Sequence, residues 1–358
     1  MNFRFFIPPL ILLIALSSCG QKEHGVRVPD WDPAFNFDWK FAKGEHPASI
    51  EPDFNDTGWE SVDLPHDWAI SGPFGPLKSN GKTGKLPWKG EGWYRKIFEL
   101  PAAAEGKRLQ FLFDGVMANP TVYLNGQKVG SWRYGYNSFW IDATEEARFG
   151  ETNLLAVHAD TREHTSRWYP GAGIYRKVGM RLVNPVHIPV WGVFVTTPEV
   201  TDEKALIDAS VEIANTSDGD QSVELEITLL DPSGTAVAEV EKKITVKAGE
   251  TIMEQIEMSI DQPGIWDIEH PDLYTCLVEL EVNRGEVQTV TTPFGIRNFQ
   301  WTANDGFHLN GRRVQLYGVN LHHDHGPLGA AFFPRAMERQ LEIMKDMGVN
   351  ALRTSHHA

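Results

Sequence analysis

We start the fold prediction from the segment Gly318-Val319-Asn320-Leu321-His322-His323-Asp324-His325. It continues a short apolar run, residues 316–319, which we predict to be a strand, so titratable side chains begin where this strand ends. Pro334 suits the first position of a following helix, because its missing N–H would have no partner there. Apolar residues recur at helical spacing until Gly348, namely Met337, Leu341, Met344 and Met347.

A second apolar run, residues 349–352, predicts another strand, and it is followed by the polar cluster Arg353-Thr354-Ser355-His356-His357. The pattern is therefore strand, helix, strand, with polar clusters after both strands. A (β/α)8 barrel places its active site at the carboxyl ends of consecutive parallel strands, and a whole barrel takes about 250 residues. We expect residues 297–358 to form the first β/α units of a truncated barrel.

Two β-rich regions precede this segment. In residues 25–184, Leu109, Phe111 and Phe113 alternate with polar neighbours, and Asn125-Gly126 marks a hairpin turn, which favours a jelly-roll β-sandwich. Residues 185–296 contain four clearly alternating segments, at 206–213, 222–229, 252–260 and 273–282. This size and pattern are typical of an immunoglobulin-like sandwich. The predicted fold is mainly β.

The first residues have the pattern of a targeting signal. Arg4 precedes an apolar run, and Leu16-Ser17-Ser18-Cys19 matches a bacterial lipoprotein box. We expect residues 1–19 to be a signal peptide, Cys19 to be lipidated, and the protein to be anchored at the cell envelope, on its periplasmic or outer face. An ordinary secretory signal is the alternative. Cys276 is the other cysteine and is expected to be a buried free thiol, and the net charge of −15 argues against a nucleic-acid partner.

Several phrases in a fixed order resemble glycoside hydrolase family 2, in particular its bacterial β-galactosidase-like members. They are Leu64-Pro65-His66-Asp67-Trp68, Gly92-Trp93-Tyr94-Arg95-Lys96, Tyr169-Pro170-Gly171-Ala172-Gly173-Ile174-Tyr175-Arg176, Phe294-Gly295-Ile296-Arg297, Gly318-Val319-Asn320, Leu328-Gly329-Ala330-Ala331 and Arg353-Thr354-Ser355-His356. Each phrase is weak alone, but their joint order over most of the chain is specific. The resemblance implies retaining hydrolysis of β-galactosides or related glycans.

The resemblance also implies roles for individual residues. His322 and His356 match histidines that contact the sugar, and Arg353 matches an arginine that lies under the site and pairs with a catalytic carboxylate. Asp324 and Trp168 are further candidates for substrate binding. The family has arginine more often where this chain has Leu321, and asparagine where it has His357. These departures concern the choice of substrate rather than the family.

Retaining hydrolysis needs two carboxylates about 5–5.5 Å apart. In the family both are glutamates on later barrel strands, so we expect both to lie beyond Ala358 and the chain as printed to be inactive. Glu338 and Glu342 lie on the predicted helix, outside the barrel, and cannot replace them. The family resemblance leaves room for a Mg²⁺, Na⁺ or Ca²⁺ ion in the full-length enzyme, and for a homo-oligomer.

Other interpretations remain open from the sequence. The cluster His322, His323, Asp324 and His325 is also compatible with a metal site of the amidohydrolase kind. Trp168 and Tyr169 could stack on a sugar or fill the core beneath a loop. The whole chain could instead be a non-catalytic, carbohydrate-binding envelope lipoprotein.

Overall fold

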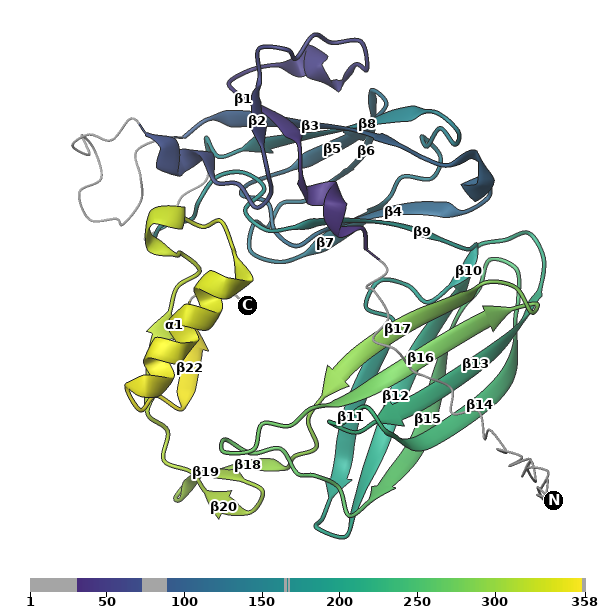
Figure 1. The fold of residues 1–358 in the computed structure, drawn as a ribbon, viewed down its shortest axis with the longest axis vertical. Helices are drawn as coiled ribbons and strands as arrows, with labels where there is room; N and C mark the ends of the chain where they lie inside the picture. Colours follow the sequence, from purple (N-terminus) through teal and green to yellow (C-terminus); the bar gives the residue numbers. More distant parts are fainter. Residues whose placement is uncertain (1–30, 73–88, 164–165, 167, 356–358) are drawn as a thin grey trace, which may run out of the picture.

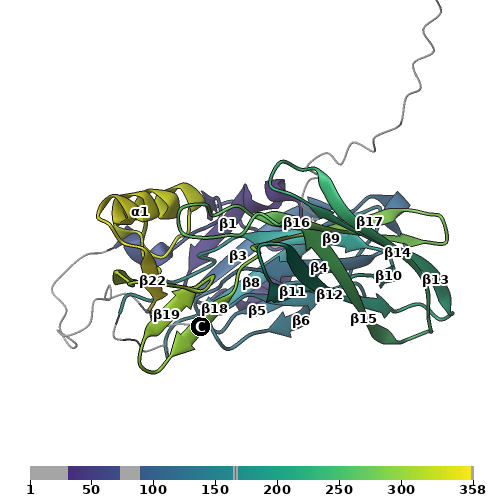
Figure 2. The ribbon, with the colours of Figure 1, turned by 90° about the horizontal axis from the view of Figure 1, so that it is seen from below.

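The computed structural model describes residues 31–72, 89–163, 166 and 168–355. Figure 1 shows a β-sandwich at the top, a second β-sandwich at the lower right, and the last segment of the chain returning to the first sandwich. Helix α1 and the second sandwich lie apart in both views (Figures 1 and 2). The mainly β fold is confirmed. Within the described residues, no helix is both long and apolar enough to span a membrane.

The first sandwich consists of two antiparallel sheets, with strand orders β2-β1-β3-β8-β5-β6 and β7-β4-β9. The strands are β1 (Trp39–Lys43), β2 (Glu60–Val62), β3 (Glu91–Glu99), β4 (Arg108–Phe113), β5 (Thr121–Leu124), β6 (Gln127–Ser131), β7 (Phe139–Asp142), β8 (Thr152–Asp160) and β9 (Val178–Val183). A 3₁₀ turn precedes β1, namely η1 (Pro33–Asn36), and three more lie between strands, namely η2 (Pro47–Ile50), η3 (Trp68–Ser71) and η4 (Ala102–Ala104). The predicted hairpin around Asn125-Gly126 is confirmed as β5 and β6.

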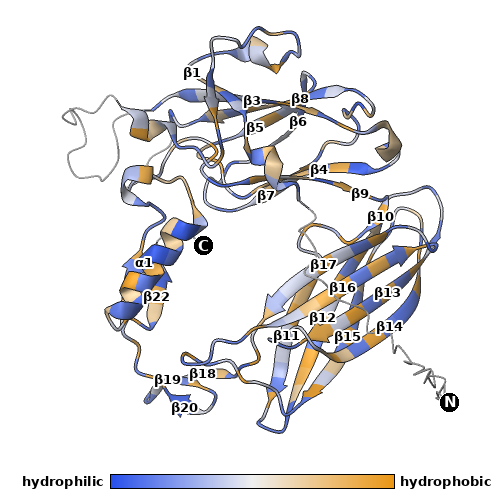
Figure 3. Cartoon of the chain, viewed as in Figure 1, coloured by the Kyte–Doolittle hydropathy of each residue, from blue (hydrophilic) through white to orange (hydrophobic). Residues whose placement is uncertain are grey.

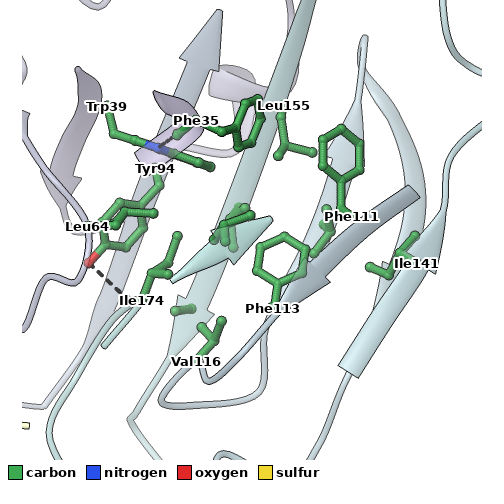
Figure 4. Packing of buried hydrophobic residues seen from close by; sticks show 14 of the residues in the cluster. Phe35, Trp39, Leu64, Tyr94, Phe111, Phe113, Val116, Ile141, Leu155 and Ile174 are labelled. Carbon is green, nitrogen blue, oxygen red and sulfur yellow. Dashed lines mark hydrogen bonds between the residues drawn. The ribbon is translucent and has the colours of Figure 1, made fainter. Parts of the chain in front are cut away.

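Aromatic side chains fill the space between these two sheets (Figure 4). Phe111 and Phe113 of β4 are fully buried, because alternate residues of a strand point to the same face. Tyr94 of β3 is also fully buried, and its hydroxyl accepts a hydrogen bond from Ile174 N at 3.4 Å. This core therefore reaches the loop that carries Tyr169 to Tyr175.

The second sandwich also has two antiparallel sheets. In one, β12 pairs with β10, β11 and β15, and the other has the order β14-β13-β16-β17. The strands are β10 (Val186–His187), β11 (Val193–Val200), β12 (Lys204–Asn215), β13 (Gln221–Leu230), β14 (Ala236–Val246), β15 (Thr251–Asp261), β16 (Tyr274–Val282) and β17 (Val287–Phe294). Figure 3 shows apolar and polar residues alternating along these strands. Cys276 is confirmed as a buried free thiol.

The last segment begins with a small sheet of β18 (Phe299–Thr302), β19 (Gly306–Leu309) and β20 (Arg312–Arg313). The parallel pair β21 (Gly318–Leu321) and β22 (Ala351–Thr354) follows, connected by the turn η5 (Gly326–Leu328) and the helix α1 (Pro334–Asp346). The predicted order strand, helix, strand is present, although both strands lie two residues later than the apolar runs. Leu316, Leu341 and Leu352 expose between 37% and 42% of their surface, so this segment has apolar side chains without a cover among the described residues.

Candidate active site

The carboxyl ends of β21 and β22 lie side by side. Their parallel register pairs Asn320 with Arg353 and Leu321 with Thr354, and Ser355 N donates to Leu321 O at 3.0 Å. His322, the residue directly after β21, therefore lies at the same edge of the sheet as Ser355, which is fully buried. Two polar clusters far apart in the sequence thus meet at one edge of this sheet.

The predicted site residues have different surroundings at this edge. His322 and Asp324 are half-buried, whereas Arg353 is exposed and its side chain makes no hydrogen bond within the described part of the chain. His356 and Cys19 lie outside the described residues. The proposed sugar contacts of these side chains stay predictions.

Trp168 of the first sandwich lies beside His322. Their ring centroids are 6.0 Å apart, and the Trp168 Nε1–H donates to Tyr136 Oη at 3.0 Å. The ring of Tyr136 in turn packs edge-on against His323, with centroids 5.3 Å apart. Trp168 is half-buried rather than part of the core. The structure therefore brings together two residues, Trp168 and His322, that the sequence predicts for the same site.

His323 holds the loop after β21 against the first sandwich. Its Nε2 lies 3.1 Å from Pro170 O, and its ring also packs on Tyr175, with centroids 5.8 Å apart. A second link nearby is the bond from Phe332 N to Tyr175 O, at 2.9 Å. Among the described residues, no group of three or more His, Cys, Asp or Glu side chains is placed to hold a metal ion.

Asp67 is the central link between the first sandwich and this loop. Its Oδ1 accepts from Ala69 N and Ala172 N, both at 3.0 Å. Its Oδ2 accepts from the hydroxyl of Tyr169 and from Ala330 N, the latter at 2.8 Å. The residue is only 2% exposed. One carboxylate thus satisfies donors from three separate segments of the chain.

Glycines permit the close approach of these segments. A Cβ on Gly329 would lie 2.4 Å from Asp67 Oδ2, and one on Gly171 would lie 2.4 Å from Ala330 Cβ. Both residues have positive φ, at 61° and 76°, which also favours glycine. Asp67 can reach Ala330 only because neither position carries a side chain.

We call Asp67 and its hydrogen-bond partners Ala69, Tyr169, Ala172 and Ala330 the Asp67 joint. Burial shifts the pKa values of the ionisable groups in and near it. It raises the pKa of Asp67, although each of its hydrogen bonds acts in the opposite direction. Burial also raises the pKa of Tyr169, and the neighbouring Asp67 adds to that effect. Because its pKa is raised, Tyr169 remains a hydroxyl donor to Asp67 at neutral pH. The pKa of His325 is lowered, mainly by burial, while the nearby Asp324 opposes the shift.

A cavity of about 370 Å³ lies elsewhere, between the second sandwich and the β18–β20 sheet. Its lining includes Asp202, Gln300 and His308, and none of the predicted site residues. We place the candidate site at the strand ends instead, because the residues implied in sugar binding meet there.

Sequence reasoning assigned no role to Asp67 or Tyr136, and for Tyr169 it left sugar stacking and core packing open, without predicting a bond to Asp67. A signal for this bond was nevertheless present, because Asp67 and Tyr169 both lie in phrases that carry the family resemblance. The phrases around Asp67, Tyr169 and Ala330 meet at one carboxylate in the structure. Tyr136 had no such signal, since its role depends on ring contacts across the fold.

Comparisons with known proteins identify the family of this chain. Residues 186–297 match the model of glycosyl hydrolases family 2, and residues 302–358 match the model of the TIM barrel domain of that family. The chain is 41% identical to the beta-galactosidase BoGH2A of Bacteroides ovatus, over 90% of this chain and 38% of that protein. It is 31% identical to a putative beta-glucuronidase of Formosa agariphila, over 97% of this chain and 32% of that protein.

A solved structure gives the same assignment. A family 2 glycosyl hydrolase from Bacteroides cellulosilyticus superposes with a TM-score of 0.86 and 36% identity, over 90% of this chain and 42% of that one. The chain therefore spans well under half the length of these relatives. The phrases, the fold and both family models agree, and the chain belongs to glycoside hydrolase family 2.

Proposed function

We propose that the protein carrying this chain is a retaining glycoside hydrolase that acts on β-galactosides. The observation that carries the proposal is the position of Trp168 beside His322, at the common edge of β21 and β22. An indole provides an apolar face for the C–H side of a sugar ring, and imidazole and carboxylate groups can bind its hydroxyls. The 41% identity to a protein named beta-galactosidase supports galactose over glucuronic acid.

In this proposal His322 and His356 bind hydroxyls of the sugar that is cleaved. Asp324 accepts a further hydroxyl, and Arg353 supports a catalytic carboxylate. The Asp67 joint holds the loop after β21 so that His322 keeps its position next to Trp168. Contacts of this kind accelerate the reaction where they strengthen as the sugar ring distorts towards the transition state.

We further propose that the chain as printed binds a sugar and does not cleave it. Cleavage requires a pair of carboxylates on the two sides of the scissile bond. Asp324, in the loop after β21, is the carboxylate that the described residues place beside the ends of β21 and β22. Purified chain of 358 residues should therefore fail to hydrolyse a nitrophenyl β-galactoside.

The test uses protein made from its own gene locus, at the length at which it is produced. Nitrophenyl β-galactoside should be hydrolysed with a kcat/KM at least about tenfold above that for the β-glucuronide. His322→Ala should lower kcat, while replacement of the exposed His270 should not. The opposite preference would move the proposal to glucuronides. Sugar binding without hydrolysis would favour a binding lipoprotein, and neither binding nor hydrolysis would overturn the proposal.

The place of action is also a proposal. Cys19 follows Leu16-Ser17-Ser18, so we propose lipidation and attachment to the cell envelope. Two acyl signals are needed for stable anchoring, as one chain gives only marginal binding. Cys19→Ala should release the protein from the membrane fraction. Unchanged membrane recovery of this variant would contradict the lipid anchor.

A further inference from the structure

A row of aromatic rings leads from the candidate site to the surface of the first sandwich. The row begins at His322 and Trp168 and continues to Tyr136, whose centroid lies 6.4 Å from that of Trp168. Tyr134 follows at 5.6 Å from Tyr136. We call these four rings the aromatic row. Neighbouring rings are in contact along its whole length, so the row has no break between the site and Tyr134.

Exposure increases along the aromatic row. His322, Trp168 and Tyr136 are half-buried, whereas Tyr134 exposes 46% of its surface. Tyr134 belongs to the loop of residues 132–138, which connects β6 and β7. A tyrosine needed only for packing would bury its ring, so the open end of the row is available for a ligand.

The same loop presents a second aromatic side chain, which is held in place. Trp132 exposes 39% of its surface, and its ring stacks on the buried Phe139 with centroids 5.7 Å apart and an interplanar angle of 10°. Its Nε1–H donates to Asn137 Oδ1 at 2.9 Å. A ring held by one stacked neighbour and one hydrogen bond loses little freedom when a ligand stacks on it, which favours binding.

We propose that loop 132–138 is a subsite for the sugar units next to the one that is cleaved, which makes an oligosaccharide the preferred ligand. This inference rests on the proposed function, because it assigns the terminal sugar to His322. Tyr134 and Trp132 stack on the C–H faces of the following sugar units, and Tyr136 and Trp168 continue the surface towards the site. Stacking of this kind tolerates different sugars, since it depends on the ring face rather than on individual hydroxyls.

The chain offers a matched control. Trp140 exposes 40% of its surface, close to the value for Trp132, and lies on β7 between the buried Phe139 and Ile141. Among the residues that the structure describes, its ring contacts none of the four rings of the aromatic row. The effect on ligand binding of removing an exposed tryptophan can therefore be compared between Trp132, in the proposed subsite, and Trp140, outside it.

The experiment measures binding of a β-linked galactotetraose and of methyl β-galactoside to the 358-residue chain by calorimetry. A β-linked oligosaccharide that ends in glucuronic acid is the third probe. Tyr134→Ala and Trp132→Ala should each weaken tetrasaccharide binding by about three- to tenfold and leave the monosaccharide unchanged. Trp140→Ala should change neither.

The outcomes separate this subsite from the proposed function. The subsite is wrong and the function stands if the wild-type chain binds the tetrasaccharide no more tightly than the monosaccharide. The same conclusion follows if Trp140→Ala weakens tetrasaccharide binding as much as Tyr134→Ala and Trp132→Ala do. If only the glucuronic-acid probe shows the loss in Tyr134→Ala, the subsite stands and the galactoside proposal fails. If none of the probes binds to the wild-type chain, the subsite and the proposal that the chain as printed binds a sugar are both overturned.

Discussion

Asp67 Oδ2 accepts a hydrogen bond from Ala330 N at 2.8 Å, although the two residues are 263 positions apart in the chain. The bond joins the first sandwich to the loop after β21, on which His322 and His323 lie. Ala172 N and the Tyr169 hydroxyl bind the same carboxylate. The position of the barrel segment against the first sandwich therefore depends strongly on one buried side chain.

Replacement of Asp67 should loosen this joint. In Asp67→Ala, three backbone N–H groups and the Tyr169 hydroxyl lose their acceptor, which should cost at least about 3 kcal/mol of unfolding free energy. Tyr169→Phe removes one of the four bonds and should cost about 1–2 kcal/mol. Denaturant unfolding measures both, and brief proteolysis should cut the Asp67→Ala protein first within residues 314–355.

Asp63 provides the control, because it is exposed and accepts one bond, from Asp38 N at 3.0 Å. Asp63→Ala should change stability by no more than about 1 kcal/mol. Equal losses in the Asp63 and Asp67 variants would show that the joint contributes no more than a surface hydrogen bond.

Two glycines of the same loop separate steric contact from backbone strain. Gly326 and Gly329 have φ of 60° and 61°, but a Cβ on Gly326 meets nothing within 4 Å, whereas one on Gly329 would clash with Asp67 and Ile70. Gly326→Ala should therefore cost about 1–2 kcal/mol from strain alone. Gly329→Ala should cost at least about 2 kcal/mol more, because the loop has to move away from Asp67. Melting temperatures that fall by the same amount in both would contradict the close packing at Gly329.

The sequence predicts local elements well where particular residues mark them. Pro334 and Gly348 define the helix, which runs from Pro334 to Asp346 as expected. The apolar runs predict both neighbouring strands two residues too early, because apolar character indicates burial and not pairing. Tyr317 illustrates this point: it belongs to the same apolar stretch, yet it precedes β21 and is 62% exposed.

Other features could not be read from the local pattern. β14 was not predicted, because Glu239, Glu241, Lys242 and Lys243 give it the composition of a solvated segment. It nevertheless pairs along its whole length as the edge strand of its sheet, where charged side chains reach solvent. The bond between Asp67 and Ala330 joins residues 263 positions apart, and no local period indicates such a contact.

His187 should make stability depend on pH. Burial, with a contribution from Arg181, lowers its pKa from 6.5 to about 4. The unfolded chain therefore binds more protons between these values, so stability is complete above about pH 6.5 and falls as the pH decreases towards 4. The loss due to this residue amounts to roughly 3 kcal/mol at most. His187→Gln should reduce the slope of melting temperature against pH in this window without removing it, because burial also lowers the pKa of His66 to about 4.

His270 is exposed in a loop of the second sandwich and serves as the control for His187. The variant His270→Gln should retain the wild-type profile. A wild-type slope that persists in His187→Gln would assign the pH dependence to other groups.

The thiol of Cys276 should report the unfolding of the second sandwich. Cys276 is fully buried on β16, between β13 and β17, and burial raises its pKa to about 12. Thiol reagents react with the thiolate. In the native protein Cys276 is therefore protected from labelling, because little of it is deprotonated and because the reagent cannot reach it. In a Cys19→Ala background, labelling across a denaturant series should therefore follow the loss of β-structure measured by circular dichroism.

Substitutions at Cys276 test the same packing by a second measurement. Cys276→Val keeps the site apolar at similar size and should cost less than about 1.5 kcal/mol. Cys276→Ser places a hydroxyl among apolar neighbours such as Val278 and Leu229, and should cost about 1–3 kcal/mol. If native protein were labelled as fast as unfolded protein, Cys276 would be accessible through local opening of β16, and the two substitutions would then have similar, small effects.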